Sequence, residues 1–174
     1  MENRISQTAG FSLIELVLTI VLVGIIGTFT SLFVYSGIRG YITTRQNSEG
    51  ALEAQIALDR ISLELRNMNS LTGTPDTTAP DLSVSYKSAV LSGTRELKYD
   101  TSQQAILISV DNGSNYYKLL ENVSSCDLIL TYLNLDHDTA PVNEVSQIDL
   151  KFNLDVIGKE FRARIFPRHL VEEK

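Results

Sequence analysis

The stretch FSLIELVLTIVLVGIIGTFTSLFVY, residues 11–35, follows a polar leader, MENRISQTAG, at residues 1–10. As a helix it would be roughly 37 Å long, at about 1.5 Å per residue, which is enough to cross a hydrocarbon core of roughly 30 Å. Its aliphatic side chains would fall on every face, whereas the surface helix of a soluble domain is apolar on one side. The stretch therefore predicts a transmembrane helix.

The apolar stretch has two alternative interpretations. A secretory signal peptide has an apolar region of about 7–15 residues that ends in a small-residue cleavage site. Here the apolar region is longer, and no Ala-x-Ala-like site follows it. The small-residue junction Ala9-Gly10 lies before the apolar region, so a cut there would remove the leader and keep the helix. A core helix of a soluble domain is the second alternative, and the length of the stretch argues against it.

Glu15 is the only charged residue in this stretch. A charge at the centre of a spanning helix costs about 2.5–3.5 kcal/mol, and less near an end. The next cations along the chain, Arg39 and Arg45, lie beyond the far end of the stretch. A cut after Gly10 would give Phe11 a free ammonium group four residues from Glu15. Cleavage would therefore create the missing countercharge, on the same helix or on a neighbouring one.

The residues GFSLIEL, Gly10–Leu16, resemble the prepilin cleavage and methylation motif shared by type IV pilins and by the pseudopilins of type II secretion. The resemblance implies that a prepilin peptidase cuts between Gly10 and Phe11 and methylates the new Phe11 nitrogen. It also implies that Glu15 pairs with the amino terminus of a neighbouring subunit during assembly.

Two features depart from the usual pattern of this family. Major pilins usually carry a proline within the apolar segment, whereas this chain has none before Pro75. Gly24 and Gly27 could loosen the helix instead. The leader is only weakly basic, so charge bias leaves the orientation open. The resemblance implies a single span of the bacterial inner membrane, with a cytoplasmic leader and a periplasmic or extracellular domain.

Residues 36–70 predict an amphipathic continuation of the helix. Apolar residues step by three and four positions along one face, which we expect to pack on a sheet rather than in a coiled coil. These residues are Ala51, Ala54, Leu58, Ile61, Leu65 and Met68. Charged residues fall mostly off that face, namely Glu49, Glu53, Asp59, Arg60, Glu64 and Arg66.

Residues 71–174 predict a β-rich globular domain that opens with a loop of Thr, Pro and Asp. The predicted strands are residues 82–86, 96–99, 105–110, 116–120, 126–133, 148–156 and 161–165. Asp111-Asn112-Gly113 predicts a tight turn. The fold class is therefore α+β, with a long amino-terminal helix packed on an antiparallel sheet, as in pilins.

Composition excludes several classes of function. The net charge of −6 gives no basic patch for nucleic acid. Cys126 is the only cysteine, so no intrachain disulfide can form, and its place in an apolar strand predicts a buried, inert thiol. The chain has only two histidines, His137 and His169, and neither lies in a recognisable catalytic pattern. We expect neither an enzyme nor a cofactor.

One acidic cluster is a weak candidate for calcium. Asn134, Asp136 and Asp138 alternate as oxygen ligands do in calcium loops. Thr139 stands where an EF-hand has glycine, and Val145 stands where it has glutamate, so the EF-hand pattern is broken. A solvated acidic turn is the preferred interpretation.

The body of the chain resembles the J-type minor pseudopilins and the W-type minor pilins. The similar segments are residues 58–66, residues 117–123 and the end of the chain around Pro167. The resemblance implies a minor filament subunit that acts in assembly, initiation or tip capping. Its partners would be the prepilin peptidase, other pilin-like subunits, the inner membrane and the assembly machinery. A membrane-tethered binding protein or adhesin is the alternative, and a major pilin is a third.

Overall fold

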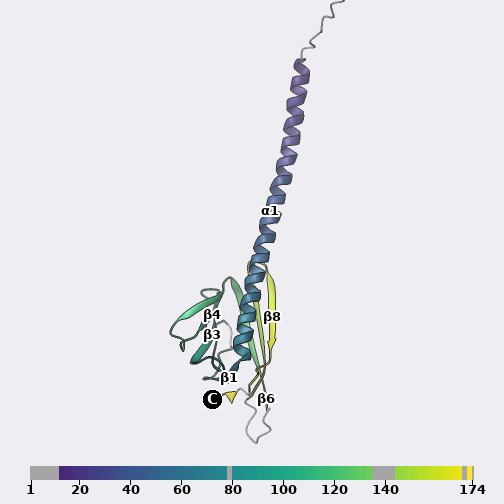
Figure 1. Ribbon diagram of the computed structural model, residues 1–174. Helices are drawn as coiled ribbons and strands as arrows, with labels where there is room; N and C mark the ends of the chain where they lie inside the picture. Colours follow the sequence, from purple (N-terminus) through teal and green to yellow (C-terminus); the bar gives the residue numbers. More distant parts are fainter. Residues whose placement is uncertain (1–11, 78–79, 135–143, 170–171, 174) are drawn as a thin grey trace, which may run out of the picture. The chain divides into compact units, whose positions relative to one another are not determined.

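The computed structural model describes residues 12–77, 80–134, 144–169 and 172–173. These residues form one long helix followed by short and long strands (Figure 1). The elements are α1 (Leu13–Arg66), β1 (Met68–Leu71), β2 (Leu82–Ser88), β3 (Thr94–Asp100), β4 (Ala105–Ser109), β5 (Tyr116–Leu120), β6 (Val123–Leu133), β7 (Glu144–Leu154), β8 (Lys159–Ile165) and β9 (Glu172–Glu173). The chain divides into two compact units between Arg45 and Gln46, and α1 contributes to both.

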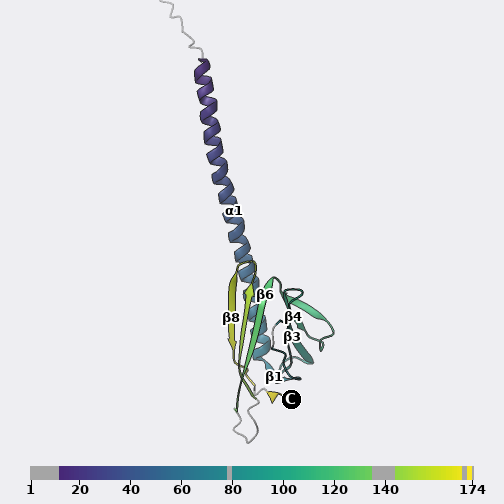
Figure 2. The same ribbon diagram turned by 180° about the vertical axis from the view of Figure 1, so that it is seen from behind.

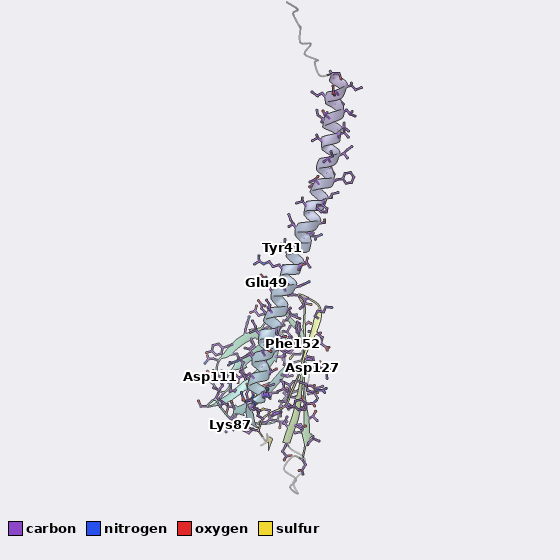
Figure 3. All side chains as sticks on the ribbon, turned by 45° about the vertical axis from the view of Figure 1, so that its right-hand side comes forward. Tyr41, Glu49, Lys87, Asp111, Asp127 and Phe152 are labelled. Atoms are coloured by element: carbon purple, nitrogen blue, oxygen red, sulfur yellow. The ribbon has the colours of Figure 1, made fainter. Side chains whose placement is uncertain are left out.

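The described part of the first unit is helix alone. Its large aliphatic and aromatic side chains are exposed and project from the ribbon on all sides (Figure 3). No proline interrupts the helix, and the aliphatic residues that dominate it are compatible with helical backbone. This segment therefore has a regular backbone whose apolar surface is left for the surroundings to cover.

The second unit is built on the last part of α1, which lies across the sheet with β3 and β4 to one side and β8 to the other (Figures 1 and 2). The side chains of Ala54, Ile61 and Leu65 are buried there, which confirms the predicted apolar face. Gly50 allows close approach, because a Cβ atom at that position would lie 3.4 Å from Leu154 Cδ2. Burial of such a face contributes roughly 25 cal/mol per Å² of apolar surface.

The sheet has the strand order β5-β4-β3-β2-β1-β9-β7-β6, and β8 pairs with β7. All neighbouring pairs are antiparallel except β1 and β9, which are parallel. Inward-facing residues of β6, β7 and β8 form cross-strand rows, such as Cys126, Phe152 and Phe161. The Phe152 and Phe161 rings stack with centroids 5.5 Å apart. The α+β class predicted from the sequence is confirmed.

Most strands predicted from the alternation of apolar and polar residues are present in the structure at about the predicted positions. The predicted hairpin of residues 96–99 and 105–110 is the β3–β4 pair, and residues 116–120 form β5. The predicted turn is also present, since Asn112 and Gly113 have positive φ angles of 60° and 78°. These are the left-handed conformations that asparagine and glycine tolerate best.

Three details of the prediction differ from the structure. The amphipathic helix ends at Arg66 rather than at residue 70, and Met68–Leu71 forms β1, paired with β2. Met68 fits the helical spacing, yet as a strand residue it buries its side chain in the same core. Val156 lies in the β7–β8 turn and is exposed. The last predicted strand is residues 161–165, which lie in β8, whereas the structure has a further short strand, β9, after it.

Candidate functional site

The predicted cleavage junction, Gly10 and Phe11, lies outside the described residues. The description begins at Ser12, and α1 starts one residue later. The predicted methylation of Phe11 and its predicted pairing with Glu15 therefore remain predictions. Glu15 itself is described, in the first turn of α1.

Ser12 is the residue that starts the helix, and the sequence interpretation missed this role. Its Oγ lies 3.3 Å from the Glu15 backbone nitrogen, and its carbonyl oxygen accepts hydrogen bonds from Glu15 and Leu16. This is an N-cap, in which a serine side chain accepts from the third helical residue. The signal was available in the sequence, because Ser-x-x-Glu before an apolar run is the pattern of a capping box.

Several hydroxyl side chains between residues 19 and 44 of α1 form hydrogen bonds within the helix. Five hydroxyl groups donate to backbone carbonyl oxygens three or four residues earlier, at 2.8–2.9 Å. These residues are Thr19, Thr28, Thr30, Ser36 and Thr44. Such bonding removes the penalty of an unpaired hydroxyl in hydrocarbon. By length and composition, α1 can cross a membrane.

An aromatic and basic cluster follows the uncharged part of the helix. The Arg39 guanidinium carbon lies 5.4 Å from the centroid of the Tyr35 ring, within the range of a cation–π contact. Tyr41 is exposed two residues further on, where Figure 3 shows it projecting from the helix. Tyrosine and arginine gather where a spanning helix meets the headgroups. The end of the span near residue 35 stays a prediction, and this cluster is of the kind that such an end carries.

A buried ion pair fastens the last part of α1 to the sheet. Arg95 Nη2 donates to Glu64 Oε1 at 2.9 Å, and Arg95 Nε lies 2.9 Å from Glu64 Oε2 without the angle of a hydrogen bond. The Tyr86 hydroxyl donates to Glu64 Oε2 at 3.3 Å, and Arg60 Nη2 lies 2.7 Å from Oε1. Glu64 and Arg95 are each only 5% exposed.

This arrangement corrects the sequence interpretation of Glu64, which placed its side chain mostly off the buried face. The carboxylate can be buried because two guanidinium groups and a hydroxyl contact it. Burial, followed by the neighbouring Glu64 charge, raises the pKa of Tyr86 well above its usual value. Tyr86 therefore stays neutral and serves as a donor to the carboxylate.

The other candidate residues do not gather into a site within the described part of the chain. Cys126 is buried, as predicted, and burial raises the pKa of its thiol to about 12. Among the calcium candidates, Asn134 follows β6, whereas Asp136 and Asp138 lie outside the described residues. Within the described part of the chain, no group of three or more His, Cys, Asp or Glu residues could hold a metal ion.

The features that stand out are therefore an apolar helix with one acidic residue in its first turn and a β domain fastened to the same helix. Together they are compatible with pilin-like architecture, in which a helix serves both as anchor and as part of a domain core. Comparison with protein-family models, with curated proteins and with solved structures finds no match for this chain.

Proposed function

We propose that this chain is a minor structural subunit of a type IV filament, either a type IV pilus or a type II secretion pseudopilus. The observation that carries the proposal is helix α1, whose first part exposes apolar residues on every face and whose last part packs on a β-sheet. The motif GFSLIEL at Gly10–Leu16 adds support, because it combines the cleavage junction with an acidic residue near the start of the helix.

In this proposal the chain is made as a precursor in the bacterial inner membrane, with its leader in the cytoplasm. The prepilin peptidase cuts between Gly10 and Phe11 and methylates the new amino group. Glu15 of one subunit then lies beside the Phe11 ammonium of a neighbour, because a carboxylate in hydrocarbon is stabilised by a nearby countercharge. This pairing would set the position of one subunit against the next.

The role is one of assembly rather than catalysis. The chain would join other pilin-like subunits and the assembly machinery, where it initiates or caps the filament. The resemblance of residues 58–66 and 117–123 to J-type pseudopilins and W-type pilins supports this minor role. The proposal requires no cofactor.

A second candidate is a membrane-tethered adhesin that uses the β domain for contact with a ligand. The observation in its favour is the exposure of Tyr116 and Tyr117 on β5, the strand at one end of the sheet order. Exposed tyrosines are common in binding surfaces. Cross-linking of the anchor helix to pilin-like partners would favour assembly, whereas binding of the chain to an external ligand, lost in Tyr117→Ala, would favour the adhesin.

Processing is the first experimental test. We predict that Gly10→Val leaves the leader attached, because a β-branched side chain at the junction blocks access of the peptidase to the peptide bond. Intact mass of the chain from cells that contain the peptidase measures this directly. Gly24→Val is the matched control, since a Cβ at Gly24 meets no atom within 4 Å. A mature Phe11 terminus in Gly10→Val would contradict the prediction.

A further inference from the structure

Two hollows flank the exposed side of α1 at its carboxyl end. One, of about 250 Å³, lies between the helix and the connection from β2 to β3, and its apolar wall is Leu63, Val90 and Leu91. The other, of about 260 Å³, lies between the helix and the end of β8, where Phe166 lines it. Figure 1 shows the last part of α1 running between β3 on one side and β8 on the other. We call the residues that line these two hollows the helix-end surface.

Leu63 is the apolar centre of the helix-end surface, with an arginine on either side of it. At 3.6 residues per turn, Arg60 and Arg66 lie roughly 60° from Leu63 around the helix, in opposite directions. Leu63 is 55% exposed, and Val90 and Phe166 are 72% and 58% exposed. Large apolar side chains that stay exposed close together are typical of a surface that another molecule covers.

The hollow beside β3 has more positive charge than its carboxylate balances. Arg60 Nη2 lies 2.7 Å from Glu64 Oε1, and Arg95 contacts the same carboxylate from the sheet. Two guanidinium groups therefore share one negative charge, and the Arg60 side chain is still 48% exposed. Asp59 adds a carboxylate to this side of the helix, where it accepts a hydrogen bond from Gln55.

The hollow beside β8 is positively charged for the same reason. Arg164 Nε donates to Asp149 Oδ1 at 3.1 Å, and Arg162 Nη2 lies 3.5 Å from the same oxygen. Arg66 lines this hollow, is exposed, and forms no ion pair with any residue that the structure describes. Around the two hollows, five described guanidinium groups face three described carboxylates. They are Arg60, Arg66, Arg95, Arg162 and Arg164 against Asp59, Glu64 and Asp149.

This combination of charge and apolar surface selects the chemistry of a partner. Guanidinium groups bind carboxylates and phosphates through paired hydrogen bonds, and arginine is enriched in protein interfaces. A nucleic acid would match the charge but would leave Leu63 and Val90 in contact with water or with charged phosphates. An acidic peptide segment with large apolar side chains would match the charge and also cover the apolar residues.

We propose that the helix-end surface binds an acidic segment of a different protein, in which leucine or phenylalanine stands between aspartate or glutamate residues. The apolar side chains of the segment cover Leu63 and enter the hollows, and its carboxylates pair with Arg60 and Arg66. The inference goes beyond the proposed filament role and does not depend on it. It rests on residues of the second compact unit alone.

Fluorescence polarisation of a labelled peptide tests the proposal on the full-length chain in nanodiscs of zwitterionic lipid. The probe is the peptide EELFEE, blocked at both ends, and empty nanodiscs give the background. We expect EELFEE to bind and KKLFKK, which reverses the charge, not to bind. The peptide EESSEE should bind at least about tenfold more weakly than EELFEE, because it lacks the two apolar side chains that leave water on binding.

Arg66→Glu and Leu63→Ser are the decisive variants, because both side chains are exposed and neither belongs to the buried core. We expect each to weaken binding of EELFEE about fivefold or more. Lys159→Glu is the control for charge, since Lys159 is exposed at the opposite end of β8. Ile129→Ser is the control for apolar surface, since Ile129 is 52% exposed and lies on β6. Both controls should bind like the unchanged chain, and near-UV circular dichroism checks the fold of every variant.

Several results would overturn the proposal. They are no binding of EELFEE, equal binding of EELFEE and EESSEE, and equal losses of affinity in Arg66→Glu and Lys159→Glu. Tighter binding of a labelled single-stranded DNA oligomer than of EELFEE would assign the surface to nucleic acid instead. Self-association of the chain that Arg66→Glu abolishes would assign it to a second copy. None of these results bears on the proposed filament role, which incorporation into filaments tests separately.

Discussion

At the scale of single residues, the helix terminus and the proposed countercharge would stabilise Glu15 to different extents. The amino terminus of a helix favours a carboxylate in its first turn by about 0.3–1 kcal/mol. Placing a charge in the middle of a bilayer costs about 2.5–3.5 kcal/mol, and less near an end. The helix terminus therefore offsets only part of the cost. A countercharge such as the Phe11 ammonium would supply the rest, which is why the proposed pairing follows from physical chemistry as well as from resemblance.

Cys126 gives a prediction that depends on burial alone. Since burial raises its pKa to about 12, the thiol stays protonated as pH rises from 7 to 9. An ordinary thiol ionises over this range and reacts faster, because the thiolate is the nucleophile. We expect no reaction of Cys126 with a thiol reagent in the folded full-length chain at either pH, and full reaction in denaturant. Ile129→Cys provides an exposed control thiol; equal rates for the two thiols in the folded chain would refute the prediction.

At the scale of elements, helix α1 combines two kinds of stabilisation along one backbone. Its first part has side-chain hydroxyls bonded to its own carbonyls and leaves its apolar surface exposed. Its last part buries Ala54, Ile61 and Leu65 against the sheet. The Glu64–Arg95 pair then fixes the helix to β3 at one position. A buried ion pair of this kind adds little net stability, because the cost of desolvating both charges offsets much of their attraction.

The Glu64–Arg95 pair can be tested by removing one or both partners. Arg95→Ala leaves a buried carboxylate with only Arg60 and Tyr86 beside it, so we expect a loss of up to about 3–5 kcal/mol in the free energy of unfolding. Replacing both residues by methionine should cost much less, because no buried charge remains. Arg60→Ala, which removes only a half-exposed partner, should cost about 0.5 kcal/mol.

Denaturant unfolding of the full chain in detergent, followed by near-UV circular dichroism, measures these differences. The order of the variants is the decisive result, with Arg95→Ala less stable than the double methionine variant. If Arg95→Ala were as stable as the parent chain, the ion pair would not hold the helix to the sheet.

Elements with regular periodicity could be predicted from the sequence, and those set by distant partners could not. Strict alternation predicted β7, and the Asn112-Gly113 turn followed from residue type. The helical spacing ran on to Met68, so it concealed β1, which exists because β2 pairs with it. Two-residue β9 has no periodicity at all. Burial of Glu64 depends on Arg95, which is far away in sequence. Helical spacing alone therefore predicted, wrongly, that the Glu64 side chain lies off the buried face of the helix.

At the scale of the whole molecule, the apolar part of α1 and the β domain that follows it support the proposed role of a filament subunit. In that proposal the membrane and the neighbouring subunits hold the chain in place. The exposed apolar residues 13–35 require lipid or other helices around them. The proposed pairing of Glu15 with the Phe11 ammonium links leader removal to assembly.

The most direct test of the central claim is the amount of this chain in sheared filaments from cells that carry its assembly machinery. Glu15→Ala and Glu15→Gln are compared with the unchanged chain, and membrane insertion is measured alongside. We predict that the unchanged chain is found in the filaments. Both variants should insert normally yet be depleted there, because each lacks the carboxylate that pairs with Phe11. Normal incorporation of both variants, or absence of the unchanged chain from the filaments, would contradict the account.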